Sequence, residues 1–365
     1  MSAALPPRPV LLDLSHVRGH VTGLERVALD LFAPERLAPH PVRCLRSRSL
    51  PGMILKQQIG IPARGWRDRA AALVFPGFPP GPLALLLGAR CLTYVHDTFL
   101  LDRPDELNWR ARAYMAPSFA LAMRFGRRFL VNSRTTGEAL RARCRADALV
   151  ALLRPPVRDV FGLADLPDPA PHRPGETLRL LAIGTVEPRK DYPAALALAA
   201  ALRAGGVEAE LHIVGRRGWG AADFLDAPPP FLHHHGYLAD AALRALVARS
   251  HLLLSTSKAE GLGLPLLEVQ HGGLPVAAPR GAVFAEVLDR SGLLIDPRDP
   301  AASAAALLAF AGAPGHGRAA RANVARWNAL AAADAERFRA FLSRGPSVYG
   351  EDPAASVPPR DSRRR

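Results

Sequence analysis

Short apolar runs alternate with longer amphipathic segments along almost the whole chain, and this alternation constrains the fold more than any other feature. Short apolar runs are typical of buried strands, and apolar residues at helical spacing are typical of helices packed on one face. The pattern predicts an α/β fold in which helices join parallel strands. In the first half, strands are expected at Val10–Asp13, Val42–Leu45, Ala72–Phe75, Cys91–His96, Phe129–Val131 and Ala148–Leu153, with helices at Gly23–Phe32, Glu106–Phe125 and Ser133–Cys144.

A polar, proline-rich stretch from Gly162 to Glu176 separates this half from a second one in which the pattern starts again. The length suits two domains of ordinary size. We expect Rossmann-like domains at residues 1–165 and 166–328, a helix at 329–344 and a disordered tail at 345–365. The second half contains predicted strands at Leu178–Gly184, Glu210–Gly215, Phe231–Gly236, His251–Ser255, Pro275–Ala278 and Leu293–Ile295, with one helix ending at Ala204 and others beginning at Asp240, Pro265 and Asp299.

Composition argues against several classes of protein. No apolar run reaches the ~18 residues that a membrane-spanning helix needs, and the start of the chain lacks the basic and apolar segments of a secretory signal. Cys44, Cys91 and Cys144 are far apart and odd in number, so they predict neither a disulfide framework nor a metal site. A cytoplasmic location is the simplest expectation.

The formal net charge of +14 is compatible with nucleic acid, anionic lipid or a polyanionic substrate as partner. Arginine is scattered along the whole chain, which argues against a concentrated nucleic-acid surface. The segment Arg110–Arg128 mixes basic and apolar residues and could lie on an anionic membrane at the inner face of the cell, although a packed helix with a basic outer side is favoured. The only lysines are Lys56, Lys190 and Lys258, and the last two fall inside the motifs described next.

Residues 255–275 form the most informative stretch of the second half: Ser-Thr-Ser-Lys-Ala-Glu-Gly-Leu-Gly-Leu-Pro-Leu-Leu-Glu-Val-Gln-His-Gly-Gly-Leu-Pro. An apolar run precedes it, so it is predicted to be a strand, a tight loop and a helix start. Pro265 suits the first helical position, and Gly261 and Gly263 permit close approach of backbone to a ligand. The N–H groups of a helix start favour an anion.

This stretch resembles the donor site of retaining GT-B glycosyltransferases of the family-4 (group 1) type, in which two glutamates bracket a glycine-rich loop. The resemblance implies that Glu268 holds the nucleotide ribose, that Glu260 faces the donor sugar, and that Gly261, Leu262, Gly263 and Leu264 contact the donor. The sequence departs from the family at Leu262, where Phe is frequent, and at Gln270-His271, which are usually small or apolar. The alternative is a buried strand–turn–helix whose glutamates only favour a helix start.

Residues 184–191, Gly-Thr-Val-Glu-Pro-Arg-Lys-Asp, follow another predicted strand. Two adjacent cations at a helix start are unfavourable unless an anion lies between them. Arg189 can bind two phosphate oxygens, and Lys190 adds a point charge. The resembling family carries Arg-Lys here, often followed by Asn where this chain has Asp191. Because these cations can neutralise a leaving diphosphate and the chain contains no Asp-x-Asp, we expect no metal requirement.

Two segments of the first half extend the resemblance. Thr22-Gly23-Leu24-Glu25-Arg26 is similar to a family loop that approaches the donor phosphate, with Gly23 allowing close approach. His96 ends a predicted strand where the family places a histidine beside the transferring sugar. The alternatives are a plain helix start for Gly23 and a polar strand end for His96. The family also carries a serine at the position of Ser133, but a helix N-cap explains that residue equally well.

His233-His234-His235 has the composition of a metal-binding tract. Successive side chains on a strand point to opposite faces, however, so these three histidines cannot converge on one ion. The sequence therefore assigns no metal ligands.

The resemblance implies a GT-B fold of two doubly wound domains facing a cleft, with the helix at 329–344 crossing back to the first domain. It implies metal-independent transfer of a hexose, with mannose favoured, from a GDP- or UDP-linked sugar to a hydroxyl of a surface glycan or its lipid-linked precursor. No other cofactor and no nucleic acid are expected. The alternatives are a non-catalytic GT-B-like nucleotide-binding protein, a basic nucleic-acid-binding protein and a sugar-nucleotide epimerase.

Overall fold

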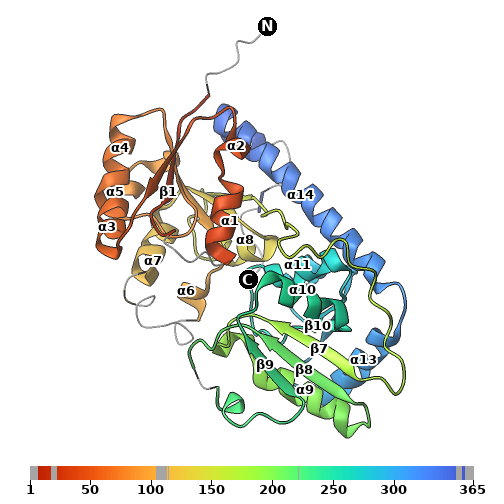
Figure 1. Ribbon diagram of the computed structural model, residues 1–365. Helices are drawn as coiled ribbons and strands as arrows, with labels where there is room; N and C mark the ends of the chain where they lie inside the picture. Colours follow the sequence, from red (N-terminus) through yellow and green to blue (C-terminus); the bar gives the residue numbers. More distant parts are fainter. Residues whose placement is uncertain are drawn as a thin grey trace. The chain divides into compact units, whose positions relative to one another are not determined.

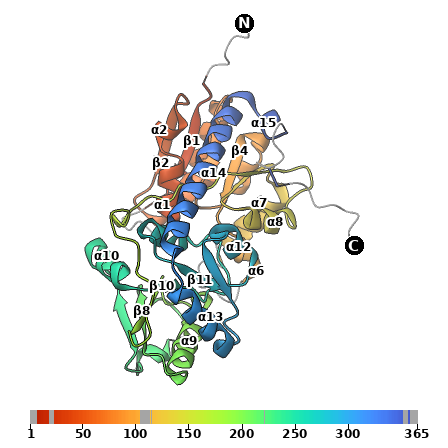
Figure 2. The same cartoon turned by 90° about the vertical axis from the view of Figure 1, so that its right-hand side faces the viewer.

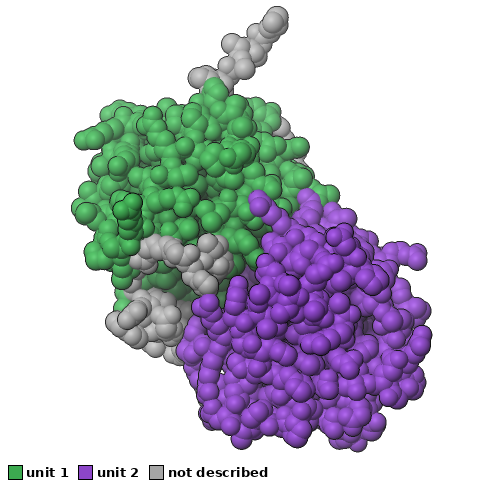
Figure 3. Space-filling model, in the orientation of Figure 1, with its two compact units in different colours: residues 1–156, 329–365 green, residues 157–328 purple. Residues whose placement is uncertain are grey.

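The computed structural model describes residues 7–17, 23–103, 113, 115–220, 222–350 and 356–357. The chain divides into two compact units (Figure 3). Unit 1 comprises Met1–Pro156 and Ala329–Arg365, and unit 2 comprises Val157–Asn328. Each unit is built on a six-stranded sheet in which all paired strands are parallel. The α/β class predicted from the alternating pattern is confirmed.

The sheet of unit 1 has the strand order β2-β1-β3-β4-β5-β6. Every strand expected in the first half forms, with ends that differ by at most one residue. The strands are β1 Val10–Leu14, β2 Val42–Arg46, β3 Ala72–Phe75, β4 Cys91–Val95, β5 Arg128–Val131 and β6 Leu149–Leu152. The helices are α1 Gly23–Leu31, α2 Pro34–Leu37, α3 Leu50–Leu55, the π-helix η1 Lys56–Gly60, α4 Ile61–Arg67, α5 Pro82–Leu85, the 3₁₀ turn η2 Gly88–Arg90, α6 Phe99–Asp102, α7 Ala116–Phe125 and α8 Arg134–Arg141.

The continuous helical run α3–η1–α4 was not predicted, because three glycines and two prolines lie within it. Gly65 shows why the run forms despite them. A Cβ at Gly65 would lie 2.8 Å from Leu87 and 2.9 Å from Leu73. Packing against the sheet therefore requires a glycine at that point, and tertiary contact overrides the low helix propensity. The predicted helix Glu106–Phe125 is seen as α7, and residues 104–112 and 114 lie outside the described part.

The long helix α14 (His316–Arg344) continues into unit 1 from Ala329 onward (Figure 2). Within unit 1, the Phe338 ring meets the Phe32 ring edge-on at 6.0 Å. The buried Asp334 carboxylate accepts from Arg154 Nη1 at 2.7 Å and from the Arg154 backbone N–H at 3.1 Å. These contacts attach the second half of α14 to the core of unit 1.

The expectation of a disordered tail from residue 345 is wrong for its described residues. Ser347–Gly350 form helix α15. Ser356 forms an isolated antiparallel bridge with Ala151, and Val357 is buried and donates its N–H to the Val150 carbonyl at 3.0 Å. An apolar valine that fits against β6 outweighs the Pro- and Ser-rich composition around it.

The sheet of unit 2 has the strand order β12-β11-β10-β7-β8-β9. Its strands are β7 Leu178–Ile183, β8 Ala209–Val214, β9 Leu232–Gly236, β10 Leu252–Leu254, β11 Val276–Pro279 and β12 Gly292–Ile295. Helix α9 covers one face of this sheet and α10 the other (Figure 1). The helices and turns are η5 Pro188–Lys190, α9 Tyr192–Ala204, η6 Asp223–Leu225, α10 Asp240–Arg249, α11 Leu264–Glu268, η7 Val269–Gly272, α12 Ala282–Leu288 and α13 Pro300–Gly312.

Unit 2 begins at Val157, earlier than the expected boundary at residue 166. Val157 and Leu163 are buried in the same apolar cluster as Trp327, and the Val157 N–H donates to Asn328 Oδ1 at 2.8 Å. The start of the segment that looked like a polar linker is therefore packed into the second unit.

The strand order of unit 2 places β7 beside β10, although two strands lie between them in sequence. This is the point at which the order of a doubly wound sheet reverses, and ligands of such sheets bind there, outside the carboxyl ends of the strands. The loops that leave β7 and β10 contain the two motifs found in the sequence, residues 184–191 and 255–263. The topology therefore brings the two motifs together.

Candidate donor site

The first loop starts at Gly184, at the carboxyl end of β7. Its φ is +145°, and a Cβ there would lie 2.9 Å from Lys190 Cε. The Lys190 side chain thus lies directly over the glycine, which no larger residue could replace without displacing it. The Tyr192 hydroxyl donates to the Gly184 carbonyl at 2.8 Å and fixes the loop from the helix side.

The two loops are tied to each other at Asp191. This residue has a left-handed backbone, with φ +51° and ψ +46°. Its carbonyl and that of Lys190 both accept from Thr256 Oγ1, at 2.8 and 3.0 Å. Asn and Asp are the non-glycine residues that adopt this conformation most readily. The replacement of the family's Asn by Asp191 therefore preserves the backbone requirement at this position.

Glu260 lies between the two cations of the first loop. Its Oε1 is 2.6 Å from Lys190 Nζ, and its Oε2 is 2.7 Å from Arg189 Nη1. Arg189 also donates to the Ala259 carbonyl at 2.8 Å and contacts Glu187 Oε1 at 2.5 Å. The side chain of Glu260 is only 9% exposed, so these charges interact where water screens them little.

Burial and charge act on Glu260 in opposite directions. Burial favours the neutral acid, but the Lys190 and Arg189 cations outweigh burial and hold the pKa of the Glu260 carboxyl below its usual value. Burial also opposes the Arg189 charge, and the Glu260 and Glu187 carboxylates more than compensate by raising the pKa of the guanidinium. The site is therefore an ionised carboxylate held by two cations at neutral pH.

A small pocket lies at this junction. Its lining includes Lys190, Tyr192, Glu260 and Gly263, together with the polar residues Ser255–Ser257. Lys190, Glu260 and Gly263 were predicted to share a site, and the structure brings them together. Arg189 joins them through Glu260. Tyr192 and Thr256 were not assigned from the sequence, although Ser-Thr-Ser stands at the head of the second motif.

The helix after Gly263 is short. α11 covers only Leu264–Glu268 and continues as the 3₁₀ turn η7, and Pro265 occupies its second position. A helix of this length contributes little dipole, so the positive charge of this region comes from Arg189 and Lys190 and not from the macrodipole. Gly263 has φ +78° and supplies the tight turn.

The remaining predicted residues of this loop differ in exposure. Leu262 is buried in the apolar cluster of unit 2, which explains why an apolar residue other than Phe is accepted there. Leu264 is partly buried against the same cluster, and Gly261 does not adopt a left-handed backbone. Glu268 is the last residue of α11 and is 5% exposed. None of these four residues lines the pocket that contains Lys190 and Glu260.

His96 lies in unit 1, directly after β4. Its Nε2 is 2.7 Å from the Pro76 carbonyl, and its ring meets Tyr94 edge-on at 4.8 Å. Burial lowers the pKa of the His96 imidazole to about 4, so the ring is neutral at pH 7. A neutral ring whose Nε2 faces a carbonyl donates its proton there, which fixes the tautomer.

Two other residues of unit 1 have clear local roles. Ser133 caps α8, because its Oγ accepts from the Thr136 N–H at 3.1 Å. Gly23 is the exposed first residue of α1, and Thr22 lies outside the described residues. Trp219 is 44% exposed, whereas Trp327 is fully buried.

Residues 177–312 match the family model of glycosyl transferases group 1. The serotype-specific mannosyltransferase WbdA of Escherichia coli is 36% identical over 115 residues, which are 29% of this chain and 14% of that protein. The match thus spans about a seventh of the length of WbdA and leaves the rest of that protein uncovered.

Two solved structures resemble nearly the whole chain. WaaG, a glycosyltransferase involved in lipopolysaccharide biosynthesis, has a TM-score of 0.63 at 15% identity and covers 92% of this chain and 100% of its own. Anabaena HepE, solved in complex with UDP-glucose, has a TM-score of 0.62 at 16% identity and covers 91% of this chain and 100% of its own. Together with the two doubly wound sheets, these matches show the GT-B fold predicted from the sequence.

Proposed function

We propose that this chain, whose residues 177–312 belong to the group 1 glycosyl transferases within a GT-B fold, transfers a hexose from a nucleotide diphosphate sugar to a hydroxyl acceptor with retention. The observation that carries the proposal is the arrangement of Arg189, Lys190 and Glu260 where β7 and β10 end. Two cations and one carboxylate at a switch point suit a diphosphate bearing a hydroxyl-rich sugar.

The proposed roles follow from charge. As the sugar–phosphate bond breaks, positive charge grows on the sugar ring and negative charge on the leaving diphosphate. Arg189 and Lys190 stabilise the leaving group, and Glu260 orients the sugar. Glu268 is assigned to the ribose, and the backbone of residues 261–264 to the donor. His96 and Gly23 are assigned to the donor from unit 1.

We propose that the leaving phosphate itself takes the proton of the acceptor hydroxyl. Glu260 is already ionised and held by two cations, which makes it a weak base. The diphosphate oxygen freed by bond cleavage lies on the side of the sugar that a retained product requires. No metal is needed in this scheme, since Arg189 and Lys190 neutralise the diphosphate.

We propose GDP-mannose as the preferred donor and a bacterial surface glycan or its lipid-linked precursor as acceptor. The similarity to WbdA supports mannose, and the UDP-glucose complex of HepE keeps UDP-sugars as the alternative. None of the described helices has both the length and the apolar character needed to cross a membrane. Peripheral membrane contact is proposed through unit 1, where Leu55, Ile59 and Leu86 are more than half exposed.

Thermal unfolding with UDP, GDP, ADP and dTDP at equal concentration, without metal and then with Mg²⁺, tests the donor site. A ligand present at 100 times its dissociation constant stabilises by about 2.7 kcal/mol. We expect one nucleotide to raise the melting temperature without Mg²⁺, and its sugar conjugate to yield a product with retained anomeric configuration by NMR.

Two outcomes would favour the rival functions. Nucleotide binding without transfer to any glycan acceptor would indicate a non-catalytic GT-B protein, and product formation without acceptor would indicate an epimerase. No nucleotide binding, combined with strongly salt-dependent binding to DNA or RNA, would overturn the proposal in favour of a nucleic-acid-binding protein.

A further inference from the structure

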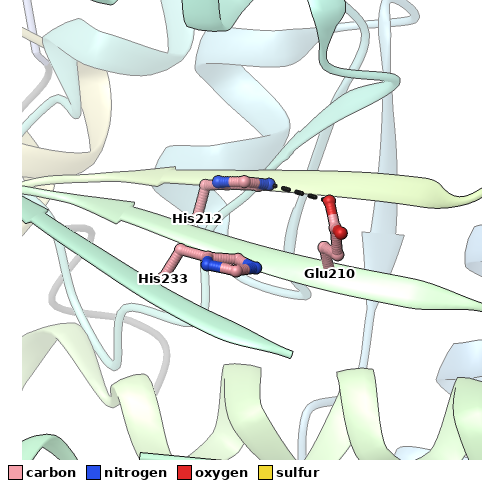
Figure 4. Close-up of side chains that lie close together, drawn as sticks. All are labelled: Glu210, His212 and His233. Carbon is pink, nitrogen blue, oxygen red and sulfur yellow. Dashed lines mark hydrogen bonds and ion pairs between the residues drawn. The ribbon is translucent and has the colours of Figure 1, made fainter. Parts of the chain in front are cut away.

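A cluster of imidazoles and one carboxylate lies on the sheet of unit 2, away from the pocket described above. His212 on β8 is paired in register with His233 on the edge strand β9. Glu210 precedes His212 by two residues and therefore shares its face of the sheet. Figure 4 shows the two rings lying face to face, with one edge of each turned toward the Glu210 carboxylate.

The distances within this cluster are short. His212 Nε2 is 3.3 Å from Glu210 Oε2, and the rings of His212 and His233 stack at 4.7 Å with an interplanar angle of 18°. One ligand atom from each of the three residues lies within 4.8 Å of the other two. Among the described residues, no other group of His, Cys, Asp and Glu side chains meets this condition.

A fourth residue fixes the orientation of His212. This residue is His235: its Nε2 lies 3.0 Å from His212 Nδ1, and the two rings stack with their centroids 5.3 Å apart. If His212 Nδ1–H donates to His235, the lone pair of His212 Nε2 points toward Glu210. A histidine that ligates a metal commonly donates its other ring N–H to a neighbour in this way.

Arg179 competes with an ion for the Glu210 carboxylate. Its Nε lies 3.4 Å from Glu210 Oε2, and its side chain is 38% exposed.

We propose that Glu210, His212 and His233 form a binding site for one Zn²⁺ ion, with His235 as a positioning residue behind His212. Two imidazoles and one carboxylate form a ligand set that zinc uses, and water supplies the remaining position. Glu210 balances part of the ion's charge.

Closure on the ion requires one ring to move. A metal lies in the plane of the imidazole that binds it, and the two rings are nearly parallel. His233 is the ring expected to turn, because it is partly exposed and belongs to the edge strand. His212 is 7% exposed and is held by both neighbours, so it stays in place.

This site is independent of the proposed transfer reaction. None of its residues lines the pocket that contains Lys190 and Glu260. Its expected effect is to join the edge strand β9 to β8, which adds stability to unit 2. The tests of the two proposals can therefore succeed or fail separately.

The experiment is titration of the full chain with ZnCl₂ by calorimetry, followed by thermal unfolding with and without zinc. The variants are His212→Gln, Glu210→Gln and His233→Gln. The matched control is His234→Gln, because His234 belongs to the same strand but points to the opposite face, where its Nε2 lies 2.8 Å from the Gly215 carbonyl. Visible absorption of the Co²⁺-substituted protein reports whether the ion is tetrahedral.

We expect one zinc ion per chain, a tenfold or greater loss of affinity in His212→Gln, Glu210→Gln and His233→Gln, and a change below twofold in His234→Gln. An equal loss in His234→Gln would assign the binding to the exposed histidine tract and overturn the proposal. So would the absence of zinc binding to the wild-type chain. His233→Gln, on the partly exposed edge strand, keeps the test decisive if the buried His212→Gln variant does not fold.

Discussion

Replacing Glu260 by glutamine should increase the affinity for a nucleoside diphosphate. In the structure, the Glu260 carboxylate occupies both Lys190 Nζ, at 2.6 Å, and Arg189 Nη1, at 2.7 Å. A diphosphate that binds these cations must displace the carboxylate or share them with it. Glutamine keeps the shape of the side chain and removes its charge, so this competition weakens.

The size of the effect follows from the two contacts. Hydrogen bonds to charged groups contribute about 1.5–3 kcal/mol, compared with about 1 kcal/mol for neutral ones. A bound diphosphate displaces the contacts of residue 260 with Lys190 and Arg189 only in part. Its affinity for Glu260→Gln therefore increases by only a fraction of this difference. We therefore expect a gain of about 1.4 kcal/mol, which is a tenfold increase in affinity.

Calorimetric titration with UDP and GDP is the appropriate assay, because ligands that lack the hexose exclude any direct contact of Glu260 with it. Glu208→Gln is the control, since Glu208 forms an exposed pair with Arg203 and should leave affinity unchanged. Turnover with the sugar donor should fall in Glu260→Gln even as nucleotide affinity rises. Unchanged or weaker nucleotide binding would refute the assignment of the phosphates to Arg189 and Lys190.

Three further predictions concern backbone, pH and ion pairing. Gly184→Ala should cost about 1–3 kcal/mol of stability and weaken nucleotide binding, because it combines a strained φ with a Cβ only 2.9 Å from Lys190 Cε. Gly175→Ala is the control: its φ is +88° but the space around it is open, so it should cost less and leave binding intact. Urea unfolding and calorimetric titration measure the two effects. The pKa of His96 is about 4 in the folded protein and 6.5 ordinarily, so the unfolded chain takes up the proton first as the pH falls. The stability that this ring contributes is complete above pH 6.5, and the free energy of unfolding should fall by about 2 kcal/mol at pH 5. Urea unfolding should show this loss in the wild-type chain and not in His96→Gln. Asp334→Ala should cost about 3–5 kcal/mol, since it removes the carboxylate that compensates the buried Arg154 guanidinium. Asp226→Ala breaks only an exposed pair and should have a much smaller effect; similar melting temperatures for these two variants would contradict the reasoning.

The sequence by itself determined the fold class and nearly all the strands, because buried parallel strands leave continuous apolar runs and helices leave a 3.6-residue period. It also located the two loops of the proposed donor site, through glycines that require unusual backbone angles and cations that require an anion. The adjacency of these loops follows from α/β topology, which places the carboxyl ends of neighbouring strands together.

Only the tertiary structure decided which side chains meet. The pairing of Glu260 with Arg189 and Lys190 joins residues about 70 positions apart, and no local pattern encodes it. No local pattern predicts the hydrogen bond of Tyr192 to Gly184 or the helical run α3–η1–α4 either. Nor does one predict the packing of Val357, which lies in a polar stretch of sequence, beside β6. The histidines show the difference most clearly: alternation on one strand correctly separates His234 from its neighbours, but the partners Glu210 and His212 lie on another strand. Strand register, which arises from packing of the whole sheet, sets which residues face one another, and a single strand's sequence does not contain it.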